Sequence, residues 1–113
     1  MSPRSWKDRI EDILDAIAEI KSFTQSLDFE EFRDDSRTLK AVALNFVVIG
    51  EAAAHVPDEI VQAHPEVAWR LMRGIRNRLV HDYFSVDPRI VWDTLQNDLP
   101  PLVESLRRIL ESP

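Results

Sequence analysis

The stretch AVALNFVVIGEAAA, residues 41–54, constrains the fold most, because it is apolar on nearly every side of a helix. A helix of this composition is typical of the buried centre of a bundle. Ser36 can cap it and Pro57 stops it, so we expect a helix over about Arg37 to His55. The chain has only two glycines, and it lacks Asn-Gly and Asp-Gly pairs and alternating strand patterns. These observations predict an all-α protein.

Apolar residues at three- and four-residue spacing predict helices on both sides of the central one. Ser5 or Ser2 can cap the first. Before the central helix we expect a helix from Trp6 to about Thr24 and a connection over Leu27 to Asp35 with room for one helical turn. After it we expect a short turn of helix over Asp58 to His64 and a helix that starts near Pro65 and frays near His81 to Phe84. The last helix is capped by Asp87, starts at Pro88 and is kinked or restarted at Pro100-Pro101. Together they form an antiparallel bundle of four main helices with one or two short extra turns.

The size and composition favour a single domain over residues 1–113. The apolar fraction of 44% can build one core, and a domain of this size still exposes enough apolar area for self-association. Cysteine is absent, which excludes disulfides, thiolate zinc sites and cysteine nucleophiles and favours a cytoplasmic location. No apolar run reaches the roughly 18 residues that a membrane span needs, and the N-terminus lacks an apolar signal core.

One segment opposes the charge of its surroundings. Residues 69–81 hold Arg70, Arg73, Arg76 and Arg78 and no acid, whereas the whole chain carries a formal charge of −6. A basic island of this kind suits a partner that bears phosphate groups. The acidic sequence pI of about 5.0 argues against broad, non-specific duplex binding.

Arg76 and His81 suit RNA cleavage without a metal. Arginine binds phosphate and stays charged, and histidine exchanges protons near neutral pH. The imidazole would activate a 2′-hydroxyl and the guanidinium would stabilise the charged phosphorane. The two residues lie five positions apart, about 140° around a straight helix. Either the helix loosens near its end, or two copies of the chain contribute to one shared site.

Structural explanations compete with this one. A histidine at a helix end often interacts with the helix dipole, and arginines on a helix often form a solvated face or pair with acids. Glu51 and His55 share a helix face, but a metal site would need a third ligand such as His64, and we expect neither a metal nor a cofactor. Glu51 interrupts an apolar helix, so we predict a buried carboxylate paired with an arginine of the later helix.

The motif Arg76-x4-His81-x-Tyr83, with polar Asn77 after the arginine, resembles that of the HEPN superfamily and its HepT-like toxin branch. The similarity extends to the helix with IGEAA at residues 49–53, to Trp69 and to Asp87-Pro88, and so covers nearly the whole chain.

The resemblance implies an all-α bundle that dimerises with two motif copies facing each other. It implies a metal-independent endoribonuclease that acts as the toxin of a two-gene system. The antitoxin would be an MntA-like minimal nucleotidyltransferase that transfers AMP from ATP to the motif tyrosine. By this resemblance Arg76 and His81 are catalytic, Asn77 orients them and Tyr83 is adenylylated, while Asp82 has no assigned role. Arg70, Arg73 and Arg78 then contact RNA or the partner, and Glu51 supports an arginine. The homodimer can also form part of a larger hetero-oligomer.

Two other functions remain open at this stage. One is a non-catalytic helical subunit that binds a nucleotide or docks a nucleotidyltransferase. The other is a plain helical dimerisation module.

Overall fold

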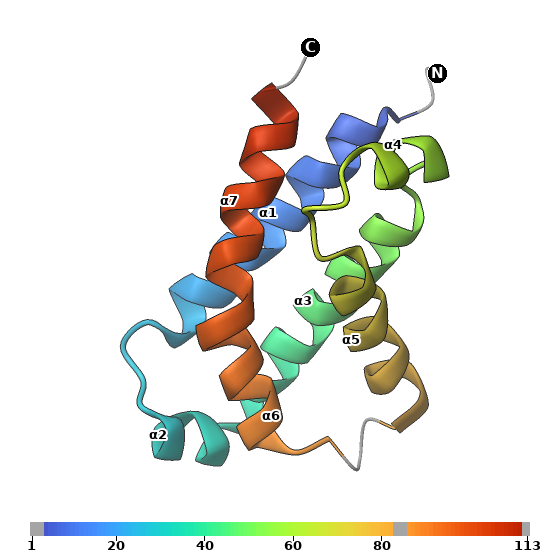
Figure 1. Cartoon of the computed structure of the whole chain (residues 1–113). Coiled ribbons are helices and arrows are strands. Elements are labelled where there is room, and N and C mark those ends of the chain that lie inside the picture. Colours follow the sequence, from blue (N-terminus) through green and yellow to red (C-terminus); the bar gives the residue numbers. More distant parts are fainter. Residues whose placement is uncertain (1–3, 83–85, 112–113) are drawn as a thin grey trace.

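The computed structural model describes residues 4–82 and 86–111, and the side chains of 4–79 and 86–111. All regular elements within those residues are helical, and the longer helices pack as a bundle (Figure 1). None of these helices is both long and apolar enough to cross a membrane. The elements are α1 (Trp6–Thr24), α2 (Phe29–Asp34), α3 (Ser36–Ala54), α4 (Asp58–Ala63), α5 (Trp69–Asp82), α6 (Pro88–Asp93), a π-helical turn (Thr94–Asp98) and α7 (Leu99–Glu111). The prediction of an all-α bundle is confirmed.

Side-chain caps start several of the helices. Ser5 caps α1 in a reciprocal capping box with Asp8, as one of the two predicted caps. For α3 the prediction of Ser36 is wrong, because Asp35 is the cap and Ser36 is the first helical residue. The Asp35 carboxylate accepts hydrogen bonds from the Thr38 amide at 3.1 Å and the Thr38 hydroxyl at 2.7 Å. Because Asp35 already accepts from the free Thr38 amide at this helix end, Ser36 becomes the first helical residue.

The predicted start of α5 at Pro65 is also wrong, because the helix begins at Trp69. The intervening residues form a turn in which the Val67 amide donates to the His64 carbonyl at 3.2 Å. The Trp69 indole donates to the same carbonyl at 3.0 Å. Val67 of the turn and Trp69, the first residue of α5, are both buried, so the turn lets two apolar side chains enter the core at the start of the helix. The predicted fraying over residues 81–84 falls largely outside the described residues.

The C-terminal helices form one nearly continuous rod (Figure 1). Asp87 caps α6 by accepting from the Arg89 amide at 2.8 Å, and Pro88 occupies the first turn, as predicted. The irregularity expected at Pro100-Pro101 lies just upstream, in the π-helical turn over Thr94–Asp98. Prolines cannot donate backbone hydrogen bonds, and the two follow directly after this turn, at the start of α7.

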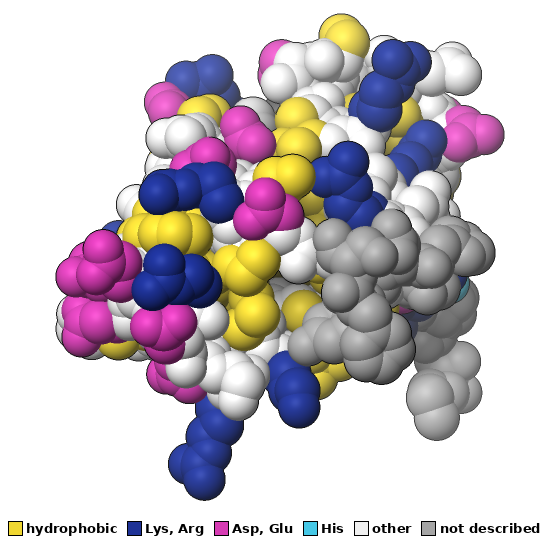
Figure 2. Space-filling model, turned by 90° about the horizontal axis from the view of Figure 1, so that it is seen from below, with side chains coloured by type: hydrophobic (Ala, Val, Ile, Leu, Met, Phe, Trp, Pro, Cys, Tyr) yellow, Lys and Arg dark blue, Asp and Glu magenta, His cyan; other side chains and the backbone are white. Residues whose placement is uncertain are grey.

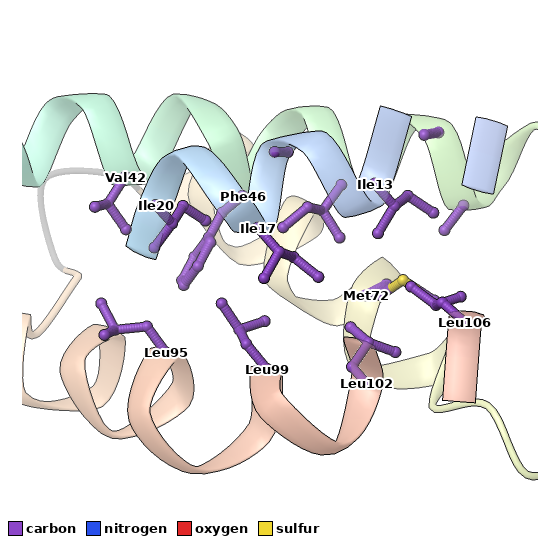
Figure 3. Close-up of a cluster of buried hydrophobic side chains, with 14 of the residues drawn as sticks. Ile13, Ile17, Ile20, Val42, Phe46, Met72, Leu95, Leu99, Leu102 and Leu106 are labelled. Carbon is purple, nitrogen blue, oxygen red and sulfur yellow. The ribbon is translucent and has the colours of Figure 1, made fainter. Parts of the chain in front are cut away.

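Side chains from four parts of the chain build the core. Isoleucines of α1, apolar residues of α3 and leucines of the C-terminal rod point toward one another, with Met72 of α5 at one side (Figure 3). The ten labelled in Figure 3 are Ile13, Ile17, Ile20, Val42, Phe46, Met72, Leu95, Leu99, Leu102 and Leu106, and all are buried. α3 packs mainly against α1 on one side and α5 on the other, which confirms its central place.

One side of α3 nevertheless stays open in the monomer. Leu44 is 66% exposed and Val48 is 38% exposed, although the apolar composition predicted burial on nearly every side. These residues lie one helical turn apart and form an apolar strip. Part of the apolar surface of α3 is therefore exposed to solvent.

The Asp35 cap generates a pH-dependent prediction. The Thr38 hydroxyl and then the Thr38 amide stabilise the carboxylate and hold the pKa of Asp35 below its ordinary value of 3.8. Its stabilising effect is complete above that ordinary value and is lost as pH falls through the lowered pKa. We expect Asp35→Ala to lower the thermal midpoint by a few degrees Celsius at pH 7 and by much less at pH 2.

Circular dichroism melts across this pH range test the effect. Asp35→Asn is the matched control, because asparagine also caps helices but does not titrate. The thermal midpoint of Asp35→Asn should lie below that of the unchanged protein at pH 7, and this difference should decrease below pH 3.8. Equal losses for Asp35→Ala at both pH values would contradict this assignment.

Candidate functional site

The contact between α3 and α5 places Arg76 beside Glu51. The Arg76 Nε donates to Glu51 Oε1 at 2.6 Å, across 25 positions of sequence. The predicted ion pair is therefore confirmed, but the prediction that the carboxylate is buried is wrong. The Glu51 side chain is 45% exposed and the Arg76 side chain 36%, so solvent reaches both partners. This bond orients the guanidinium more than it stabilises the fold.

Asn77 holds a second edge of the same guanidinium. The Arg76 Nη1 donates to Asn77 Oδ1 at 3.1 Å. An arginine head has five N–H donors, so these two bonds leave donors on both terminal nitrogens available. Within residues 4–79 and 86–111, no further hydrogen bond occupies these donors, and an arginine head oriented in this way suits the binding of an oxyanion.

The backbone of α5 stays helical between Arg76 and His81. The helix is continuous through Asp82, so it does not loosen between the two residues. Asn77 and His81 are four residues apart and share one helix face. The bond to Asn77 therefore draws the Arg76 head toward the face on which His81 lies. The side chains of His81 and Asp82, and the whole of Tyr83, fall outside the described residues.

The other arginines of α5 lie on its surface. Arg70, Arg73 and Arg78 are exposed, and no acid within residues 4–79 and 86–111 forms an ion pair with them. Arg70 and Arg78 also border a cavity of about 620 Å³ between α5 and α6, whose walls include Leu71, Ile75 and Ile90. Within that part of the chain, these three arginines are therefore not salt-bridge donors to acidic neighbours, in contrast to Arg76.

Acidic side chains gather on a different part of the molecule. α2 and its cap carry Asp28, Glu30, Glu31 and Asp34, and α2 lies at the lower left of Figure 1, away from α5 at the right. Seen from below, acidic side chains cluster at the left, over the α2 end (Figure 2). The separation leaves α5 as a basic helix on an acidic protein.

The alternative pairing of Glu51 with His55 does not form a metal site. The His55 Nδ1 lies 2.8 Å from the Glu51 carbonyl oxygen, while the Glu51 carboxylate bonds to Arg76. His64 is hydrogen-bonded to Glu66 at 3.2 Å instead. Among the described residues, no three histidine, aspartate or glutamate side chains are grouped closely enough to hold a metal ion.

Gly50 is not among the predicted site residues, yet on α3 it lies against the base of the Arg76 side chain. A Cβ atom added at Gly50 would meet the Cβ of Arg76 at 2.0 Å. A lone glycine inside an apolar helix is the sequence signal for such a close approach, because glycine weakens a helix unless packing requires it.

Comparison with known proteins shows the family of the chain. The chain matches the family described as ribonuclease HepT-like over residues 13–109. A protein of Thermococcus cleftensis named as a probable ribonuclease HepT is 43% identical over 108 residues, which cover 93% of this chain and 98% of that one. A candidate RNase of Methanocaldococcus jannaschii is 35% identical over 100 residues, covering 88% of this chain and 83% of the relative. No solved structure is significantly similar. The chain belongs to the family of HepT-like ribonucleases.

Proposed function

We propose that this protein is an endoribonuclease that cleaves RNA without a metal, through Arg76 and His81. The observation that carries the proposal is the Arg76 head, which Glu51 and Asn77 orient while its other donors bind no side chain that the structure describes. The family and the names of the relatives favour RNA as the substrate. The proposal therefore rests on two observations, an oriented arginine that can bind phosphate and membership of a family of ribonucleases.

The chemistry follows from the two side chains. The His81 imidazole removes the proton of a 2′-hydroxyl, and the 2′-oxygen attacks the adjacent phosphorus. Arg76 stabilises the negative charge on the phosphorane oxygens. The bond from phosphorus to the 5′-oxygen then breaks, and the leaving oxygen takes up a proton. The products are a 2′,3′-cyclic phosphate and a free 5′-hydroxyl.

The exposed arginines of α5 are the proposed contacts to the rest of the RNA. Arg70 and Arg73 precede Arg76 on α5 and Arg78 follows it, and all three lack acidic partners among the described residues. Contacts of this kind bind phosphates without reading sequence and depend strongly on salt. They would give a locally basic cleft in an acidic protein.

The proposed active form is a homodimer with two copies of the motif at one site. Leu44, Val48 and Glu51 follow one another at helical spacing on α3, so the exposed apolar strip leads to the Glu51–Arg76 pair. A second copy packed on this strip by a twofold axis would bring its own Arg76 and His81 nearby. The dimer would also bring Arg76 of one copy near His81 of the other, so that a site would not require both residues to come from one chain.

The proposed regulation is that of a toxin silenced by a cognate MntA-like nucleotidyltransferase. In this scheme AMP is transferred from ATP to the Tyr83 hydroxyl, with release of pyrophosphate. Tyr83 is two residues from His81 in sequence, so the added phosphate would bring bulk and negative charge next to the catalytic histidine. It would compete with RNA for Arg76 and repel the RNA backbone.

Cleavage assays in EDTA test the activity. We expect the purified, unmodified protein to cut RNA and leave cyclic phosphate ends. Arg76→Ala and His81→Ala should each lower the rate by about 10² to 10⁴, the range for losing a charge-stabilising or proton-transferring group. Arg33→Ala, on the acidic α2, is the matched control and should cleave normally. RNA binding without cleavage would instead support the non-catalytic binding subunit.

Sedimentation tests the dimer. We expect Leu44→Glu to convert the dimer to a monomer and to abolish cleavage, because a charge would be buried in the apolar contact. Phe23→Glu, at a comparable exposed apolar residue of α1, should remain dimeric. A monomer that cleaves RNA at full rate would contradict the shared site.

Mass spectrometry after co-expression with an MntA-like nucleotidyltransferase tests the regulation. We expect an AMP adduct on Tyr83 and loss of cleavage, because the adduct blocks the Arg76 phosphate site. Tyr83→Phe should carry no adduct and should remain active beside the nucleotidyltransferase. Neutralisation of the unchanged protein without an adduct would contradict this mechanism.

A further inference from the structure

We infer that Gly50 is a positioning residue for Arg76, because its missing side chain sets how closely α5 lies on α3. The consequence for cleavage rests on the proposed ribonuclease function, whereas the positioning itself does not. Gly50 and Glu51 are adjacent on α3, and each fixes a different part of the same arginine. Gly50 admits the base of the side chain, and Glu51 holds its head.

The distances at Gly50 leave no room for any side chain. An added Cβ would lie 2.0 Å from Arg76 Cβ, 2.8 Å from Arg76 Cγ and 2.9 Å from the Met72 carbonyl oxygen. Carbon atoms in good contact lie about 3.5 to 4.0 Å apart. Arg76 Cβ and the Met72 carbonyl are anchored to the α5 backbone, so no rotation of a side chain relieves the overlap. A methyl group at position 50 must push the two helices apart.

The other glycine of the chain provides the contrast. Gly74 lies on α5 itself, two residues before Arg76, and a Cβ added there meets no atom within 4 Å. Nothing in the described part of the structure therefore requires glycine at position 74. The requirement at position 50 is specific to the helix crossing.

The crossing controls the place of the guanidinium. The Arg76 Nε lies 2.6 Å from Glu51 Oε1, and the Cβ and Cγ atoms of the same side chain pack against Gly50. Separating the helices by about 1 Å would draw the head away from Glu51 or tilt it relative to Asn77. A misplacement of this size can reduce catalysis by about 10²-fold. A merely structural glycine would lower stability without moving the arginine head.

Nuclear magnetic resonance separates these two roles without any activity measurement. The Arg76 Nε–H resonance is assigned by its loss in Arg76→Lys, and its bond to Glu51 by its shift in Glu51→Gln. We expect Gly50→Ala to shift or broaden this resonance and Gly74→Ala to leave it in place. An unchanged Arg76 resonance in folded Gly50→Ala would overturn the inference.

Thermal unfolding of double variants identifies the atoms involved. We expect Gly50→Ala to lower the melting temperature, and Gly74→Ala to keep or raise it because alanine favours helix. The decrease in melting temperature caused by Gly50→Ala should persist in an Arg76→Ala background, because the Cβ at position 76 remains. The decrease should become clearly smaller in an Arg76→Gly background, because that Cβ is absent. An equal loss in both backgrounds would place the strain elsewhere and contradict the contact with Arg76.

Cleavage kinetics then measure the consequence. We expect Gly50→Ala to lose about 100-fold in kcat with KM little changed, because Arg76 acts on the transition state. Ile109→Val, a buried change in α7, is the control for lost stability and should retain near-normal kcat. If the unchanged protein cleaves no RNA, the proposed function fails while the resonance and unfolding measurements still decide the role of Gly50. Normal kcat in a folded Gly50→Ala would overturn the kinetic consequence.

Discussion

The close contact between α3 and α5 is the constraint on which the rest of this structure depends. α3 is the central helix, and α5 packs along it at a crossing where only glycine fits opposite Arg76. The same crossing brings Glu51 within 2.6 Å of the arginine. Packing and site geometry are therefore linked, because the distance at which α5 packs on α3 also determines where the Arg76 side chain lies relative to Glu51.

Charge on this protein is divided between helices rather than spread evenly. α5 carries four arginines, while α2 and its cap carry a cluster of acids on another part of the surface. Arg76 is held by a glutamate from α3 and an asparagine on its own helix, which orient it without enclosing it. An arginine that is both oriented and solvent-accessible can meet a phosphate with little reorganisation, which is the physical basis for the proposed role.

The sequence predicted local features well where the cause is local. Asp87 and Pro88 start α6 as expected, because a cap and a first-turn proline act within a few residues. The prediction that a helix begins at Pro65 was wrong, because residues 64–67 form a turn that lets Val67 and Trp69 be buried. A carboxylate in an apolar helix predicted an ion pair between Glu51 and an arginine of the later helix, and the structure shows that this arginine is Arg76. The predicted burial of Glu51 was wrong, since exposure depends on how neighbouring helices cover that edge.

The sequence by itself determined the helical class, the central helix and the basic composition of residues 69–81, because periodicity, caps and charge are written in neighbouring residues. Tertiary structure alone decided which side of α3 remains open at Leu44 and Val48 and which α3 residues meet Arg76. The physical reason is distance along the chain. Residues 50 and 51 approach residue 76 only through the crossing of two helices, and no local pattern specifies the depth of that crossing.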